Sequence, residues 1–199
     1  MQLRNSLLGA FVLFLLLDLE LLALGSALLL VLYFYLRRNP QPAITDYKPE
    51  LYRAPVDGKV IAVVEENGEH RIDIESSYRD RAVLRFMNNA TVTQIVLVHG
   101  SYLSKESPLF EKLNEYATVT FQEDDGTLYK VRHRVKNTPL PLELQLKEGQ
   151  KSLQGMGYGF LCNSITSIYL PKTFHLATLQ EGMHVVGGES ILARKVTAS

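Results

Sequence analysis

Apolar residues along this chain follow two different patterns. No polar side chain occurs from Leu7 to Leu17, and only Ser26 interrupts a second apolar run from Leu21 to Leu36. Unbroken runs of this kind predict helices that lie in a membrane. From residue 51 onward the apolar residues come in short, mostly alternating stretches, which predict β-strands.

Asp18 and Glu20 separate the two apolar runs and limit how they can meet a membrane. An ionised carboxylate at the centre of a spanning helix costs about 2.5 to 3.5 kcal/mol, so both side chains are expected near a surface. A single span over Leu15–Leu36 meets this requirement, and so does a hairpin of two segments that turns at Asp18–Glu20. The sequence leaves both arrangements open. The apolar stretch is too long for a cleaved signal peptide, so we expect a retained anchor.

Charges beside the apolar runs predict the orientation of the chain. Arg4 is the one basic residue before the apolar runs. Several basic residues follow them: Arg37, Arg38, Lys48 and Arg53. This excess places the following domain on the cytoplasmic side of an inner or cytoplasmic membrane. Three prolines between residues 39 and 50 predict an extended linker. We therefore expect a membrane anchor over 1–38, a linker over 39–50 and a β domain over 51–199.

The β domain is predicted to contain many short strands. The segments with alternating or β-branched apolar residues are Val60–Glu65, Arg71–Glu75, Ala82–Met87, Thr91–His99, Ala117–Gln122, Leu128–Val135, Leu142–Leu146, Ile165–Leu170 and Ser190–Arg194. Only Ser107–Tyr116 has a locally helical pattern. So many short strands are more than one flat sheet accommodates, which predicts a mainly β fold, either a barrel or a two-sheet sandwich.

Composition excludes several classes of function. Lys plus Arg and Asp plus Glu both total 21, so no net charge favours nucleic acid. Arg132, His133, Arg134 and Lys136 form a basic cluster, but the interleaved Val131 and Val135 are typical of a strand with one solvated face. The single cysteine excludes an internal disulfide, and the five histidines lack the spacing of a metal site. We expect neither a nucleic-acid partner nor a metal.

The stretch from Gly155 to Pro171 contains the candidate chemistry. Glycines at three alternate positions, 155, 157 and 159, allow the backbone to approach another group closely, and a strand is predicted to follow at Ile165–Leu170. Ser164 lies where the pliable segment meets the strand. This placement suits a backbone that distorts at one peptide bond, and it also suits an ordinary tight turn into a strand.

Five segments, in order along the chain, resemble the phosphatidylserine decarboxylase family. They are Ala54–Val60 (Ala-Pro-Val-Asp-Gly-Lys-Val), Phe86–Asn88, Lys112–Glu115, Asn163–Pro171 (Asn-Ser-Ile-Thr-Ser-Ile-Tyr-Leu-Pro) and Val186–Ala193. Together they extend over almost the whole β domain. Ala54–Val60 and Gln180–Glu189 also resemble the paired signatures of biotinyl- and lipoyl-type β sandwiches, which adds a barrel-sandwich-hybrid-like fold to the expected ones. The carrier lysine motif of those domains is absent from this chain.

The resemblance implies a specific reaction. In the family, a serine attacks the carbonyl that precedes it, the chain breaks there, and the serine becomes a pyruvoyl group that acts as an electron sink during decarboxylation. Ser164 matches this serine and Asp57 matches a family aspartate. Asn163 stands where the family has glycine, and Thr93 stands where it has a proton-handling histidine. The implied cofactor is thus a pyruvoyl group made from Ser164, and the implied substrate is a phosphoserine lipid of the membrane.

Two functions remain open from the sequence. The first is a membrane-anchored decarboxylase of phospholipid metabolism that is processed at Ser164. The second is a catalytically inactive relative that binds lipid or serves as a scaffold, as a homo-oligomer or as a subunit of a membrane complex. The substitutions Asn163 and Thr93 favour the second function, because threonine does not exchange protons near neutral pH as imidazole does.

Overall fold

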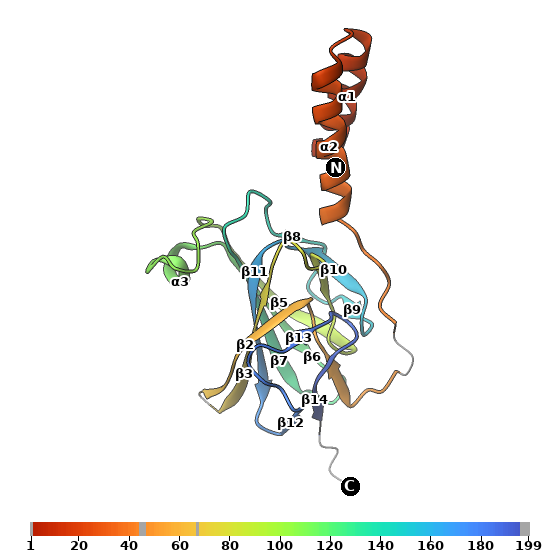
Figure 1. The fold of residues 1–199 in the computed structure, drawn as a ribbon. Helices are drawn as coiled ribbons and strands as arrows, with labels where there is room; N and C mark the ends of the chain where they lie inside the picture. The colour runs from red at the N-terminus through yellow and green to blue at the C-terminus, as the bar shows by residue number, and fades with distance from the viewer. Residues whose placement is uncertain (1, 44–46, 67, 196–199) are drawn as a thin grey trace. The chain divides into compact units, whose positions relative to one another are not determined.

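The computed structural model describes residues 2–43, 47–66 and 68–195 of the chain. The chain separates into two compact units, residues 1–38 and residues 39–199 (Figure 1). The first unit is helical and the second is mainly β. Each unit is described by itself below.

The first unit is a hairpin of two helices, α1 (Gln2–Leu16) and α2 (Glu20–Leu36), which pack against each other. The chain reverses at Asp18, whose φ of 55° is a left-handed conformation. Ala23, Ser26 and Leu30 are the buried residues of α2 and lie on one face at helical spacing. The Ser26 hydroxyl donates to the Ala23 carbonyl oxygen at 2.8 Å, so its polar group is satisfied within the helix.

The hairpin decides between the two predicted arrangements of the apolar runs. A single continuous helix over Leu15–Leu36 is wrong, because the chain turns between α1 and α2 at Asp18. Most large apolar side chains of the hairpin are exposed, among them Leu21, Leu28 and Val31. Within the described residues, no helix has both the length and the apolar character needed to cross a bilayer. A membrane location for the hairpin stays a prediction.

The second unit is built around one eight-stranded sheet that curls into a half-barrel (Figure 1). Its strands follow the spatial order β13, β2, β3, β11, β7, β6, β5, β9. Their bounds are β2 (Gly58–Glu66), β3 (Glu69–Ser76), β5 (Ala90–Val98), β6 (Tyr116–Gln122), β7 (Leu128–Val135), β9 (Lys151–Ser152), β11 (Ser164–Pro171) and β13 (His184–Val185). The predicted mainly β fold is confirmed, and its main sheet is a half-barrel.

Two small sheets complete the second unit. One contains β1 (Leu51–Arg53), β14 (Ile191–Lys195) and β12 (Phe174–Leu176), and the other contains β4 (Val83–Arg85), β10 (Gly157–Phe160) and β8 (Glu143–Leu144). The predicted helix over Ser107–Tyr116 is reduced to one turn, α3 (Phe110–Leu113), because β6 already begins at Tyr116.

The hydrophobic core contains side chains from the half-barrel and from both small sheets. Six aromatic side chains are almost fully buried in it: Tyr52, Phe86, Phe121, Tyr129, Tyr158 and Phe174. They contact one another edge-on, tilted or stacked, with centroids of Phe86 and Tyr158 4.8 Å apart. Aromatic contacts of this kind contribute beyond the burial of their area, so they hold the two small sheets to the main one.

The first residues of the linker, 39–42, make contacts with the rest of the second unit. The buried Arg85 guanidinium donates to the Asn39 side-chain oxygen at 2.7 Å and to the Pro40 carbonyl oxygen at 2.8 Å. A Cβ on Gly188 would come within 3.1 Å of the Pro42 ring. Residues 39–42 therefore contact the β domain.

Candidate functional site

The Asn163–Ser164 bond lies where the chain enters β11. Asn163 has a φ of 50°, a left-handed conformation that glycine adopts at the least cost and asparagine tolerates better than most residues. Its side-chain amide donates to the carbonyl oxygen of Asn137 at 3.0 Å, which helps to hold this conformation. The residue before Ser164 therefore has the backbone geometry that favours glycine, although it is asparagine.

The carbonyl group of Asn163 is held by a backbone donor. The N–H of Lys136 donates to the Asn163 oxygen at 3.0 Å. A fixed N–H at this distance stabilises negative charge that develops on a carbonyl oxygen under nucleophilic attack. The bond that Ser164 would attack therefore has one oxyanion donor already in place.

The Ser164 side chain is buried without a hydrogen-bond partner. Its residue has no exposed surface, and its Oγ makes no hydrogen bond within the part of the chain that the structure describes. Across the sheet, Ser164 is paired with Ser76 of β3 on one side and with Val135 of β7 on the other. A buried polar atom without a partner is unusual in a folded protein and is consistent with a reactive role.

Asp57 lies close to this part of the sheet, but its carboxylate is engaged elsewhere. The Ser76 hydroxyl donates to the backbone oxygen of Asp57, which connects Asp57 to the strand beside Ser164. The Asp57 carboxylate accepts from Arg81 Nε at 2.5 Å and from the Gly187 N–H at 2.7 Å. In this conformation Asp57 is an ion-pair partner that fixes the loop before β14.

Thr93 is far from Ser164. It lies at a register shift in β5, is exposed, and donates its hydroxyl to the Thr120 carbonyl oxygen at 3.1 Å. Two strands, β7 and β6, separate β5 from β11, which places the strands about 14 Å apart. His99, which follows β5, has a largely exposed side chain that contacts Glu115. Neither residue can exchange a proton with Ser164 in this structure.

His133 is the histidine that the fold brings near Ser164. It lies on β7 opposite Thr166, two residues from Val135, the partner of Ser164. The side chain of His133 lies on the same inward face as that of Ser164. Residues in this diagonal position on neighbouring strands lie about 7 to 8 Å apart. The His133 ring hydrogen-bonds to Thr166 Oγ1 at 2.9 Å and to Tyr158 Oη at 2.6 Å. Complete burial lowers the pKa of His133 to about 3, so the ring is neutral at pH 7.

A cavity of about 210 Å³ opens beside Asn163. It is lined by Glu75, Lys105, Lys136, Asn137 and Asn163, together with Ser104 and Glu106. Both lysines bind the Glu75 carboxylate, at 2.8 Å for Lys105 and 2.5 Å for Lys136. The pKa of Glu75 is lowered, because these two lysines outweigh the burial that acts in the opposite direction. The polar lining of this cavity therefore lies beside the candidate bond between Asn163 and Ser164.

Sequence reasoning missed His133 although the pattern of β7 contains the signal. Tyr129, Val131, His133 and Val135 alternate with charged residues and therefore share one face of the strand. The histidine was assigned to the basic cluster of its neighbours Arg132 and Arg134, whose side chains lie on the other face. Its proximity to Ser164 additionally depends on the pairing of β7 with β11, which the sequence does not show.

No group of three or more His, Cys, Asp or Glu side chains in the described ranges is arranged to hold a metal ion. Comparison with known proteins gave neither a matching family model nor a matching curated protein. The geometry around Asn163 and Ser164 is therefore the main support for a functional interpretation.

Proposed function

We propose that this protein is a phosphatidylserine decarboxylase-like enzyme that cleaves its own chain between Asn163 and Ser164. One observation carries the proposal: a left-handed residue whose carbonyl accepts a backbone N–H stands directly before a buried serine hydroxyl with no partner. An ordinary strand start requires neither the left-handed residue nor the buried hydroxyl without a partner, whereas the N–H bond to the Asn163 oxygen continues the pairing of β7 with β11. The five segments that resemble the decarboxylase family support the same bond.

The residues in place can perform the first step of the cleavage. Ser164 Oγ attacks the Asn163 carbonyl carbon, and the Lys136 N–H stabilises the charge on the carbonyl oxygen. The C–N bond then breaks, the serine proton passes to the nitrogen, and an ester remains. Elimination from the ester releases Asn163 as a carboxylate, and loss of ammonia by hydrolysis completes a pyruvoyl group at position 164. When present, that ketone supplies the electron sink for decarboxylation of an amine-bearing lipid head group.

His133 is a histidine that the fold brings near Ser164, whereas Thr93 lies on another part of the sheet. Both of its ring nitrogens are already hydrogen-bonded, to Thr166 and Tyr158, and burial lowers its pKa to about 3, so it is a poor acceptor for the hydroxyl proton. In this proposal the serine proton passes to the departing nitrogen, and His133 holds Thr166, which lies two residues along β11 from Ser164.

Mass spectrometry of the purified chain tests the proposal directly. Cleavage converts the 22.4 kDa chain into two pieces, and the smaller contains residues 164–199 with a blocked amino terminus. Ser164→Ala should abolish the fragments, and Asn163→Gly should increase their fraction, because glycine reaches the left-handed conformation at lower cost. Ser167→Ala, in the same strand, is the control and should leave cleavage unchanged. An intact wild-type chain would exclude the pyruvoyl mechanism.

A catalytically inactive lipid-binding or scaffold protein is the second candidate. The full burial of Ser164 and the commitment of the Asp57 carboxylate to Arg81 favour it. For this function, the uncleaved protein should bind phosphatidylserine vesicles and release no carbon dioxide from them. Release that disappears in Ser164→Ala would remove this candidate.

The hairpin serves as a membrane anchor in both proposals. Its longer helix has 17 residues and extends about 25 Å, less than the hydrocarbon core of about 30 Å. Two such helices joined at Asp18 can enter the membrane and return, with Asp18 and Glu20 toward the opposite surface. Arg37 and Arg38, which lie over the rings of Tyr33 and Tyr35, mark the cytoplasmic interface in this arrangement. The membrane then presents phospholipid to the β domain.

A further inference from the structure

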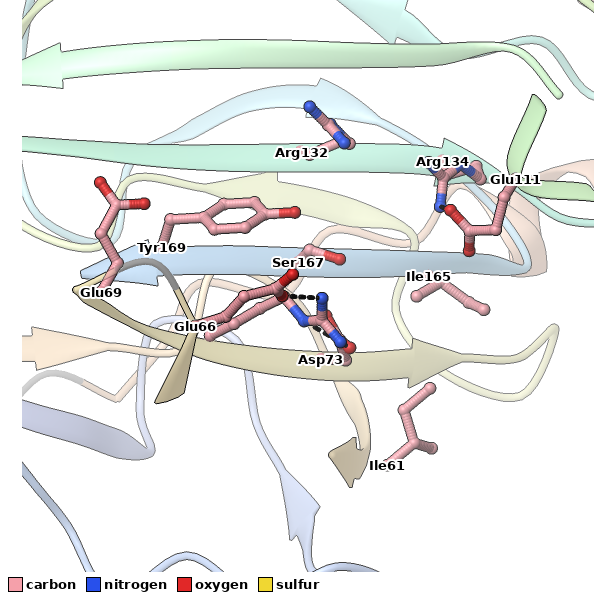
Figure 2. Close-up of a pocket in the computed structure, with 11 residues that line it drawn as sticks. Ile61, Glu66, Glu69, Asp73, Glu111, Arg132, Arg134, Ile165, Ser167 and Tyr169 are labelled. Carbon is pink, nitrogen blue, oxygen red and sulfur yellow. Dashed lines mark hydrogen bonds and ion pairs between the residues drawn. The ribbon is translucent and has the colours of Figure 1, made fainter. Parts of the chain in front are cut away.

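A cavity of the β domain lies on the outer face of the half-barrel, opposite to the face of Ser164. It has a volume of about 460 Å³ and is lined by charged and hydroxyl side chains of β2, β3, β7 and β11 together with Glu111 of α3. Figure 2 shows Ile165, Ser167 and Tyr169 along β11, with Arg132 and Arg134 of β7 on one side. Because strand side chains alternate, this face of β11 is opposite to that of Ser164 and Thr166. We call this cavity the outer groove.

Most charges in the outer groove are already paired. Arg71 binds Glu66 at 2.5 Å and Asp73 at 3.3 Å, and Arg134 binds Glu111. Glu69, at the rim of the groove, is 3.7 Å from Lys130. These pairs are typical of a solvated strand face and need no ligand.

Arg132 differs from the other two arginines of the groove. No carboxylate lies within ion-pair distance of its guanidinium in the described part of the chain. Its Nε donates to Thr118 Oγ1 at 3.1 Å, and its guanidinium carbon lies 5.2 Å and 5.8 Å from the ring centroids of Tyr116 and Tyr169. The two rings and Thr118 hold the side chain in one orientation. Its two terminal nitrogens remain available as a donor pair.

Other polar atoms of the groove also lack partners. Asp73 Oδ1 and Arg134 Nε are buried and make no hydrogen bond to the described residues. Arg134 is the more enclosed of the two, with a side chain only 8% exposed. Hydroxyl groups of Ser167 and Tyr169 lie along the same cavity and can donate to an anion. Buried polar atoms gathered in one cavity are expected where a ligand or ordered water completes the hydrogen bonding.

We propose that the outer groove binds a small molecule through a singly charged oxyanion group, a carboxylate or a phosphodiester, held by Arg132. A planar guanidinium presents two parallel N–H groups that match two oxygens of such an anion. The four carboxylates of the groove disfavour a second negative charge on the ligand, so doubly charged anions bind more weakly. The volume of the cavity is in the range of small-molecule sites. This site is independent of cleavage at Ser164.

Titration of the full chain in detergent, followed by arginine side-chain NMR, tests the proposal. Acetate and dimethyl phosphate are the singly charged probes, and they distinguish a carboxylate from a phosphodiester ligand. Sulfate is the doubly charged comparison. At least one singly charged probe should shift the Arg132 Nε–H signal saturably, and sulfate should bind several-fold more weakly.

Variants locate the site within the groove. Arg132→Gln should weaken binding of the preferred probe about tenfold or more, as expected for a lost charged hydrogen bond. Tyr169→Phe should weaken it by a smaller factor, because the ring remains and the hydroxyl is removed. Lys172→Gln removes an exposed charge outside the groove and should leave the affinity unchanged. Absence of saturable shifts, tighter binding of sulfate, or full affinity in Arg132→Gln would overturn the proposal.

Discussion

At the scale of single residues, the two positions that depart from the decarboxylase pattern have different meanings in the structure. Asn163 has a left-handed backbone conformation that glycine adopts at lower cost. Thr93, which stands at the histidine position in the proposed resemblance, lies three strands from Ser164, where a histidine could not reach the hydroxyl. The residue that supplies an imidazole to this region is His133.

The burial of His133 predicts how stability depends on pH. The pKa of His133 is lowered to about 3, whereas an unfolded histidine titrates near 6.5. Between these values the unfolded chain binds a proton that the folded chain excludes, so this residue makes stability fall as the pH falls. The contribution is about 1.4 kcal/mol per pH unit.

Urea unfolding of the wild type and His133→Gln between pH 7.5 and pH 4 measures this contribution. The difference between the two free energies of unfolding should be constant above pH 7 and should shift in favour of the variant below pH 6. Parallel curves for wild type and His133→Gln would contradict the neutral, buried state of the ring.

At the scale of elements, the glycine-rich segment before Ser164 forms a strand and not a loop. β10 lies between β4 and β8 and pairs with both. A Cβ on Gly159 would lie 2.7 Å from the Glu143 carbonyl oxygen, so only glycine permits this approach. The close contact at Gly159 is the kind of approach that the alternating glycines indicated.

Gly159→Ala should destabilise the β domain by about 1 to 3 kcal/mol, because the backbone of β8 would have to move. Gly157→Ala is a matched variant, since its Cβ would meet chiefly one side-chain atom of Val83, at 3.2 Å. Because the Val83 side chain has to move less than the backbone of β8, Gly157→Ala should lower the free energy of unfolding by less than Gly159→Ala. Thermal or urea unfolding of both variants measures the difference, and equal losses would show that the contact with Glu143 does not limit the packing.

At the scale of the whole molecule, the chain combines an apolar helical hairpin with a separately organised β unit. Large apolar side chains are exposed over much of the hairpin, whereas those of the β unit are mainly collected in one core. Contiguous apolar surface of this extent is unusual for a protein in water and marks an interaction surface. This surface is the basis of the proposed membrane anchor.

Sedimentation with phospholipid vesicles tests the anchor. Leu28→Lys replaces an exposed hairpin side chain and should reduce the bound fraction several-fold without unfolding the β unit, because a lysine is costly in hydrocarbon. Val64→Lys makes the same kind of change at an exposed position of β2 and should leave binding unchanged. Equal binding of wild type and Leu28→Lys would contradict insertion of the hairpin.

The sequence by itself determined the elements and the candidate bond. Period-two alternation identified most of the longer strands, and it predicted β7 with the bounds that the structure has. The uninterrupted apolar runs identified the two helical segments. Among the strands of two to four residues, β4 and β8 lie within predicted strands. β1, β9, β10, β12 and β13 escaped prediction, because so few positions cannot show a period. Ser164 is the residue between the glycine-rich segment and the predicted strand, and it is the first residue of β11 in the structure.

Only the tertiary structure decided which side chains meet. Ser164 and His133 are 31 positions apart, and they become neighbours because β11 pairs with β7 in one particular register. The same pairing, on the opposite face, aligns Arg132 with Ser167 and creates the outer groove. Alternation assigns each side chain to one face of a strand, but it carries no information about which strands are adjacent. Adjacency depends on packing of the whole core, and both proposed sites depend on it.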